Sequence, residues 1–286
     1  MKPKTNALLL SAALVALFIA AQVVAGMMAM LWGVWQTAQT GADISPTLLT
    51  DNPAWTGVAM VFAYALLGIL LWGTGLIRRS LLPKRTPAMP GRWGWGLLAF
   101  FAISMAIGFL TDPFSLDDGG SLALFEGMKG NMLCLLLLVV LGPFTEEIVF
   151  REGVLRIMKR GGFSSLTAIL TSAALFALIH GNLAQAVPAF GLGVLLGYLY
   201  VRTGDIRLSL IAHILNNAFA ITGLFFPQLD EATSSLSIPA SIAIGILLAL
   251  PGLALFAWSA VRAPKESWDS AVEPSPTLPQ QGRYET

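Results

Sequence analysis

Charged residues are scarce in this sequence. Only 12% of its 286 residues are charged and 56% are hydrophobic, whereas soluble domains carry about 25% charged residues. That composition excludes a soluble globular fold. The net charge is +1 and no basic domain is present, so we expect no nucleic acid as a partner. The composition indicates an integral membrane protein whose surroundings are the lipid bilayer.

Cysteine and histidine are also nearly absent. The single Cys134 cannot form an internal disulfide, and a thiol in an apolar helix carries little thiolate, which disfavours a thiol protease. Only two histidines are present, His180 and His213, and both fall within predicted apolar helices. Because ionisable groups are costly at membrane depth, they usually mark functional positions.

Long apolar runs predict an all-α, polytopic membrane protein with about eight transmembrane helices. A bilayer core of about 30 Å needs roughly 20 apolar residues per helix. The runs that fit this requirement, or nearly do, are 7–35, 55–77, 93–110, 131–150, 166–183, 187–201, 208–226 and 238–261.

The charges of the connecting loops alternate along the chain. Lysine and arginine precede the first helix and follow the second, fourth, sixth and eighth, while the other loops are mainly acidic. By the positive-inside rule this pattern predicts a multi-pass protein with cytoplasmic termini. The many Ala, Leu and Gly residues and the short loops favour a prokaryotic inner membrane. We divide the chain into three helices with their loops (1–130), a core of four helices (131–226), an eighth helix (227–262) and a proline-rich, disordered cytoplasmic tail (263–286).

One polar motif follows the apolar run of the fourth helix. Glu147 and Arg151 are spaced i, i+4 and can pair on one helical face, while Glu146 is rotated by about 100° and is left to point elsewhere. A simpler interpretation is a helix end at the membrane interface whose charges, Glu152 included, extend toward water.

Two further polar pairs lie in later helices. Phe176 and His180 share one helical face, as do His213 and Asn217. We expect the folded bundle to bring the two histidines and Asn217 to Glu146. A carboxylate, imidazoles and an amide are the groups that activate water and hold an oxyanion.

In straight, untilted helices the two histidines would lie at different depths in the membrane. His213 lies roughly 9 Å past Arg207, whereas His180 lies roughly 25 Å past Ser164. The fifth helix therefore either begins outside the hydrocarbon and tilts, or enters from an indentation in the cytoplasmic face.

The ordered set Glu146-Glu147 with Arg151, Phe176 with His180, and His213 with Asn217 resembles the signature of a known family. It is similar to the CAAX protease and bacteriocin-processing (CPBP, or Abi) intramembrane proteases, which include the Ras-converting CAAX endopeptidases. The resemblance covers 131–226. It implies an intramembrane endopeptidase that cleaves a membrane-associated or lipidated, CAAX-like protein or peptide.

The resemblance also implies a role for each motif residue. Glu146 would be the general base that activates water, assisted by His180, and His213 and Asn217 would stabilise the oxyanion. In supporting roles, Glu147 and Arg151 would hold the helix and tune Glu146, and Phe176 would accompany His180.

Two alternatives remain open from the sequence. We expect no cofactor, but Glu146, His180 and His213 would suffice as a three-ligand zinc site with water in the fourth position. The same buried residues would also serve a proton- or cation-coupled transporter, although no internal repeat supports that class. The sequence specifies neither the substrate nor the oligomeric state.

Overall fold

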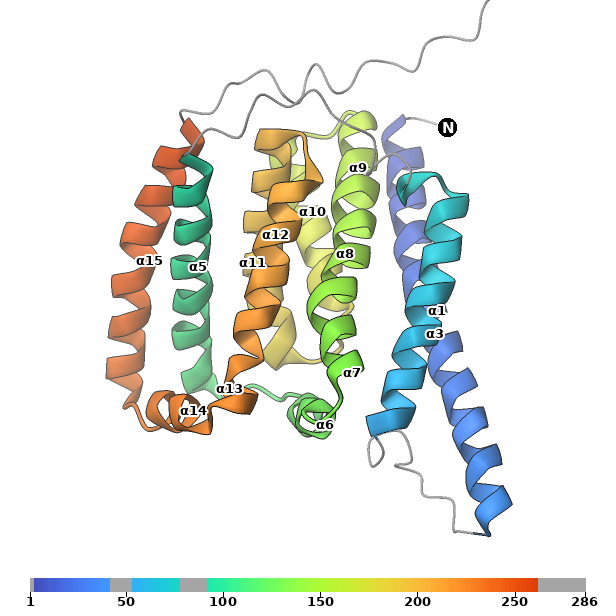
Figure 1. Ribbon diagram of the computed structural model, residues 1–286. Helices are drawn as coiled ribbons and strands as arrows, with labels where there is room; N and C mark the ends of the chain where they lie inside the picture. The colour runs from blue at the N-terminus through green and yellow to red at the C-terminus, as the bar shows by residue number, and fades with distance from the viewer. Residues whose placement is uncertain (1–2, 42–52, 78–91, 262–286) are drawn as a thin grey trace, which may run out of the picture.

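A computed structural model describes residues 3–41, 53–77 and 92–261. Within these ranges the chain is helical and contains no strand (Figure 1). The predicted disordered tail and the acidic residues Asp43 and Asp51 lie outside the described residues. The larger helices are α1 (Pro3–Thr40), α3 (Pro53–Gly73), α5 (Arg92–Thr111), α10 (Ser165–Leu178), α11 (Leu183–Thr203), α12 (Ile206–Ala220) and α15 (Ile238–Val261).

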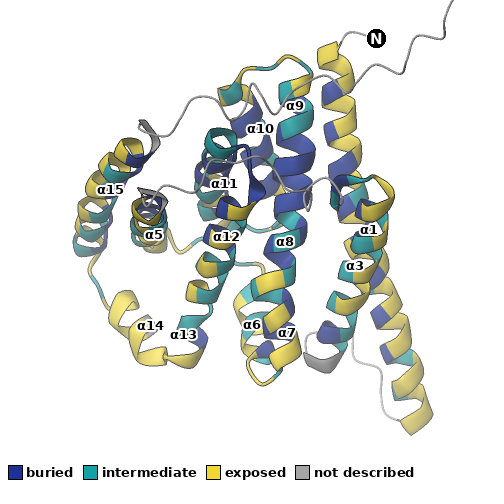
Figure 2. Cartoon of the chain, turned by 45° about the horizontal axis from the view of Figure 1, so that its top comes forward, coloured by how far each residue is buried: buried dark blue, intermediate teal, exposed yellow. Residues whose placement is uncertain are grey.

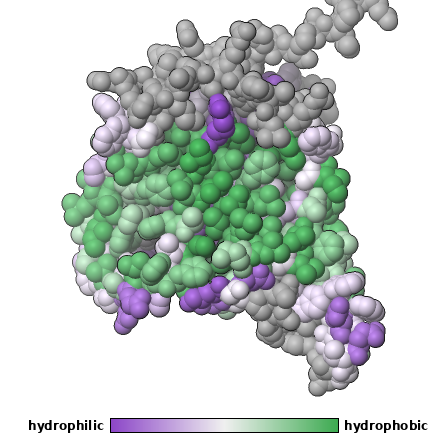
Figure 3. Space-filling view, in the orientation of Figure 1, coloured by the Kyte–Doolittle hydropathy of each residue, from purple (hydrophilic) through white to green (hydrophobic). Residues whose placement is uncertain are grey.

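Seven helices in the described ranges are long and apolar enough to cross a membrane. They include a continuous helix, Met132–Arg160. Helix α10, which corresponds to the fifth predicted segment, is apolar but shorter. An apolar band separates two polar ends of the molecule (Figure 3). The predicted all-α, multi-pass architecture is confirmed. The cytoplasmic placement of the termini stays a prediction.

Side-chain caps define where the core helices begin. Ser164, Asn182 and Asp205 precede α10, α11 and α12, and the side chain of each accepts a hydrogen bond from a backbone N–H of the first turn. Such caps satisfy donors that have no partner within the helix. The polar residues between the apolar runs therefore fix the register of each core helix.

The helices form a central core with a helix pair on either side (Figure 1). The segments of Met132–Arg160 lie with α10, α11 and α12 in the centre, α1 and α3 pack on one side, and α5 and α15 on the other. Burial is most extensive in the central helices (Figure 2). Apolar side chains such as Leu31, Ile69 and Leu247 are exposed on the outer helices, where lipid would surround them.

The helix that carries the carboxylate motif is interrupted by wide turns. Along Met132–Arg160, α7 (Met132–Leu136) leads into a π-helical segment, Leu137–Leu141, followed by α8 (Gly142–Glu147), a second π-helical segment, Ile148–Leu155, and α9 (Arg156–Arg160). Single π-helical turns are frequent at functional sites.

This geometry corrects the interpretation of the motif as an interfacial helix end. The helix continues to Arg160, beyond the predicted end at residue 150, and so the motif lies in its interior. Glu147 and Arg151 are 0% exposed and Glu152 is 2% exposed. Glu152 does not extend into water either, because it is buried and pairs with Arg156 at 2.6 Å.

Several short helices at the ends of the long ones were not predicted. They are a 3-10 turn (Asp112–Phe114), α6 (Ser121–Met128) and α14 (Pro227–Ser234), whereas α13 (Thr222–Phe225) falls within the predicted segment 208–226. The helices α6, α13 and α14 lie at the same end of the molecule (Figure 1). They cover that end without contributing any of the predicted catalytic residues.

Candidate active site

Glu147 is the centre of a buried ion-pair cluster. Its Oε1 lies 3.2 Å from Arg151 Nη2 and 3.1 Å from His213 Nδ1, and neither Glu147 nor Arg151 is exposed. Because desolvated charges are costly unless they are paired, this cluster ties α8 to α12. The predicted pairing of Glu147 with Arg151 is thus present in the structure.

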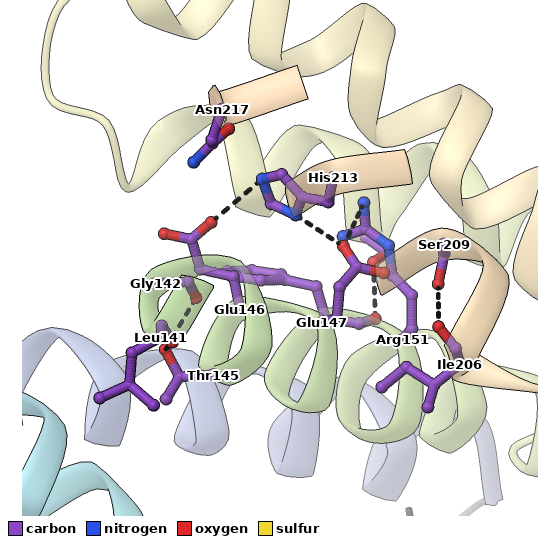
Figure 4. Close-up of polar contacts among 12 residues, drawn as sticks. Leu141, Gly142, Thr145, Glu146, Glu147, Arg151, Ile206, Ser209, His213 and Asn217 are labelled. Atoms are coloured by element: carbon purple, nitrogen blue, oxygen red, sulfur yellow. Dashed lines mark hydrogen bonds and ion pairs between the residues drawn. The ribbon is translucent and has the colours of Figure 1, made fainter. Parts of the chain in front are cut away.

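His213 lies between the two glutamates (Figure 4). Its Nδ1 faces Glu147, and its Nε2 lies 3.5 Å from Glu146 Oε2. A carboxylate accepts hydrogen bonds, so the Nδ1 proton points to Glu147. The other nitrogen of the same ring therefore faces Glu146, whose side chain is 20% exposed and is the more accessible of the two carboxylates.

The Phe176 ring connects three parts of the core. Its centroid lies 5.0 Å from that of His180 and 5.6 Å from that of His213, both edge to face, and the Arg151 guanidinium lies 5.1 Å from it. Both imidazoles thus contact one aromatic ring, so they reach the same depth. The disagreement expected for straight helices does not arise.

His180 is not inside a helix, contrary to the sequence prediction. Helix α10 ends at Leu178, and His180 lies in the turn before Gly181, which has a φ of 73° that favours glycine. His180 Nδ1 lies 2.8 Å from the Phe176 carbonyl oxygen. Since a carbonyl only accepts, Nδ1 donates, and Nε2 of the neutral ring keeps a lone pair that can accept a proton.

Asn217 lies one helical turn after His213 on α12, on the Glu146 side of the imidazole (Figure 4). Its Nδ2 donates to the Leu138 carbonyl at 3.3 Å, within the first π-helical segment. The neighbouring Asn216 points elsewhere, because its Oδ1 accepts a hydrogen bond from Ser104 of α5 at 2.5 Å. Of the two consecutive amides, Asn217 is therefore the one near the carboxylates.

The proposed zinc ligands do not form a three-ligand set. Among the described residues, no three His, Cys, Asp or Glu side chains come together as metal ligands. His213 directs one nitrogen to each glutamate, and His180 uses one nitrogen for a backbone carbonyl. Glu146 and His213 form a close pair, whereas His180 joins them through the Phe176 ring.

Sequence reasoning missed two residues near this cluster. Ser172 of α10 donates to the Phe150 carbonyl at 2.8 Å, within the second π-helical segment. The Tyr64 hydroxyl of α3 lies over Gly142, one turn before Glu146. A serine and a tyrosine in apolar helices carry no spacing signal, so only the packing of the helices reveals them.

Comparison with known proteins shows that these residues lie in a segment that is similar to a known family. Residues 129–219 match the sequence model of the family described as Type II CAAX prenyl endopeptidase Rce1-like. This segment of the chain therefore resembles the Rce1-like endopeptidases. The match contains Glu146, Glu147, Arg151, Phe176, His180, His213 and Asn217, and it confirms the resemblance to the CPBP family that the motifs indicated.

Curated relatives come from bacteria. "Putative membrane peptidase YdiL" of Bacillus subtilis (strain 168) is 23% identical over 134 residues, which are 44% of this chain and 54% of the relative. "Uncharacterized protein YyaK" of the same strain is 25% identical over 56% of this chain and 58% of the relative. "Membrane-embedded CAAX protease MroQ" of Staphylococcus aureus (strain USA300) is 32% identical over 29% of this chain and 35% of the relative.

Because these alignments are partial, they limit which properties of the relatives can be assigned to this chain. The chain spans about half the length of the first two relatives and about a third of the last. No solved structure matches the chain. The comparisons therefore establish an Rce1-like core within a multi-pass membrane protein.

Proposed function

We propose that this protein is an intramembrane endopeptidase that hydrolyses a peptide bond of a membrane-associated or lipidated protein or peptide. The observation that carries the proposal is the contact of Glu146 and Glu147 with opposite nitrogens of His213 inside an Rce1-like core. Apolar side chains of similar size would fill the same space at a lower cost in free energy. Packing alone therefore does not explain a buried carboxylate cluster of this kind.

Glu146 is the general base of the proposed reaction. It takes a proton from water while the water oxygen bonds to the scissile carbonyl carbon, which yields a tetrahedral oxyanion. When the C–N bond breaks, the proton on Glu146 passes to the departing amine nitrogen. His180 assists through the nitrogen that its bond to the Phe176 carbonyl leaves available.

His213 and Asn217 stabilise the oxyanion in this scheme. Both lie on α12 beside Glu146 (Figure 4). The Asn217 amide has a second N–H besides the one bound to the Leu138 carbonyl, and His213 can donate from Nε2 when both ring nitrogens are protonated. Glu147 and Arg151 hold the His213 ring in place from the buried side. Fixed donors in a site with little water are worth more than the same donors in solution.

We further propose that the reaction needs no metal. His213 directs both ring nitrogens to carboxylates of this chain, and Glu147 already has Arg151 as a cationic partner. If Glu146 were a zinc ligand, another group would have to act as the base.

The test is cleavage of reporter peptides by the purified full chain in lipid vesicles. One peptide carries a prenylated CAAX-like terminus and a second has the same sequence without lipid. Wild type is compared with Glu146→Gln and His180→Ala, each with and without a zinc chelator. Glu126→Gln is the matched control, because Glu126 is an exposed glutamate on α6.

We expect wild type and Glu126→Gln to cleave the lipidated peptide equally, with or without chelator. Glu146→Gln should lose at least about a thousandfold of the activity, because the amide cannot accept the proton of the attacking water even if the water is correctly positioned. Loss of wild-type activity on chelation, restored by zinc, would overturn metal independence. Full activity of Glu146→Gln would contradict the assignment of the base.

A further inference from the structure

We propose that Tyr64 of α3 is a further catalytic residue, whose hydroxyl binds the water that Glu146 activates. This inference rests on the proposed function and deepens it. Tyr64 lies outside the Rce1-like segment 129–219. The proposal therefore gives the N-terminal helices a part in the chemistry.

The Tyr64 hydroxyl packs against Gly142, where a residue with a side chain would leave no room for it. A Cβ built on Gly142 would be 2.9 Å from Tyr64 Oη and 3.8 Å from Cζ. Real Cβ atoms essentially never approach another heavy atom that closely, so any larger residue at position 142 would displace the phenol. The absence of a side chain at Gly142 thus places the hydroxyl directly against α8.

Glu146 occupies the same strip of the helix surface. Gly142 and Glu146 are spaced i, i+4, and helical side chains lean toward the preceding turn, so the carboxyl side chain of Glu146 extends over the turn that contains Gly142 (Figure 4). The hydroxyl and the carboxylate therefore share one part of the helix surface.

No direct hydrogen bond joins Tyr64 and Glu146 among the described residues. Two oxygen groups that face one turn of a helix without a direct hydrogen bond are suited to hold a single water between them. A phenol can donate to that water oxygen while Glu146 accepts its proton. This is the geometry required of a nucleophilic water.

The proposed arrangement places Glu146 between two polar partners. Helices α3 and α12 lie on opposite sides of α8 (Figure 1), so Tyr64 approaches from one side and His213 from the other. The Tyr64 ring packs against the central hydrophobic cluster. Phenylalanine would preserve that packing, so the hydroxyl oxygen is what a catalytic role would require.

The first test compares Tyr64→Phe with the matched control Tyr198→Phe, because Tyr198 packs on Phe256 away from the carboxylates. In the full-length protein we expect Tyr64→Phe to lower kcat about tenfold with KM and the unfolding midpoint unchanged, as for loss of one hydrogen bond to a reacting group. Tyr198→Phe should match wild type. Equal kcat values for the two variants would overturn the proposal.

A second variant moves the hydroxyl without removing it. Gly142→Ala places a methyl group 2.9 Å from Tyr64 Oη, which must move away, and so it should also lower kcat. Combining it with Tyr64→Phe should cost little beyond either single change, because both act on one contact. Multiplicative losses in the double variant would contradict the shared contact.

An infrared measurement separates failure of this inference from failure of the proposed function. The difference between wild type and Glu146→Gln isolates the Glu146 carboxyl band without any substrate. We expect Tyr64→Phe to shift that band and Tyr198→Phe to leave it unchanged. If no peptide is cleaved but the band shifts, the hydroxyl contact stands and the protease assignment fails. If peptides are cleaved and neither the band nor kcat changes, Tyr64 has only a packing role.

Discussion

His213 Nδ1 lies 3.1 Å from Glu147 Oε1, so a carboxylate with no solvent exposure fixes the orientation of the imidazole. That orientation determines which ring nitrogen faces Glu146. Of the two consecutive glutamates in the motif, Glu147 is buried as the partner of His213, while Glu146 remains partly accessible. The two carboxylates therefore differ in exposure, in keeping with the different tasks that the proposed mechanism gives them.

The first prediction separates these tasks by changing Glu147 to glutamine. Glu147→Gln keeps the shape of the side chain but removes the charge that faces Arg151 and His213. We expect kcat to fall by about a hundredfold or more, because a misoriented imidazole cannot serve the transition state. Peptide cleavage with KM and kcat measured separately provides the test, and KM should change little.

Stability provides the control for this variant. Glu147→Ala leaves the Arg151 charge buried without its partner, which should cost about 3–5 kcal/mol of unfolding free energy. Glu147→Gln should cost less, because its amide oxygen can still accept a hydrogen bond from Arg151. Equal stability of wild type and Glu147→Ala in detergent would show that the ion pair does not hold the core together.

The second prediction concerns the ring that both histidines contact. Phe176→Leu keeps an apolar side chain but removes the aromatic contacts with Arg151, His180 and His213. We expect kcat to fall about tenfold, because the two imidazoles lose their common support and Arg151 loses a cation–π contact worth about 0.5–2 kcal/mol. Cleavage rates and thermal unfolding are measured on the same preparations.

Phe100→Leu is the matched control, because Phe100 is equally buried in a different hydrophobic cluster. Both variants should lose comparable stability, while only Phe176→Leu should lose activity. A parallel decline of activity in the two would mean that packing, and not contact with the histidines, explains the Phe176 result.

The sequence predicted the fold well because the bilayer imposes simple rules. A helix that crosses it must be long and apolar, and all eight predicted segments are helical in the structure. The i, i+4 spacing likewise predicted the pairing of Glu147 with Arg151. These features depend on local periodicity, which a single sequence contains.

Contacts between helices could not be predicted in the same way. The position of His180 in a turn depends on where α10 ends, and the contact between Tyr64 and Gly142 depends on how α3 packs against α8. The π-helical turns have no composition signal, and so the burial of Glu152 was also missed. Each of these features results from packing between segments that are distant in the sequence.

The third prediction tests how the wide turns after Glu147 are supported. Ser172 donates to the Phe150 carbonyl at 2.8 Å across two helices, and its side chain is buried. Ser172→Ala should destabilise the protein by about 1–3 kcal/mol, because a buried carbonyl would lose its side-chain donor. Thermal unfolding in detergent measures the change.

Ser259→Ala is the control, because Ser259 is buried and donates at the same distance to a carbonyl of its own helix. Loss of that local bond should have almost no effect. Equal destabilisation by the two substitutions would argue against a specific role for Ser172 in holding the π-helical segment.

The fourth prediction concerns how the first helix packs against the core. A Cβ on Gly161, at the end of α9, would lie 2.3 Å from Ala7 Cβ of α1, and neither atom can rotate away. The Gly161 φ is −72°, so alanine is not strained by the backbone itself and steric overlap with α1 is the reason for harm. Gly161→Ala should therefore lower the free energy of unfolding by about 1–3 kcal/mol, measured by thermal unfolding.

Gly26→Ala is the control, because nothing lies within 4 Å of the added methyl group and a helical Gly→Ala change there should stabilise the protein by about 0.5–1 kcal/mol. If Gly161→Ala were as stable as Gly26→Ala, α1 would not pack against α9 as the structure has it.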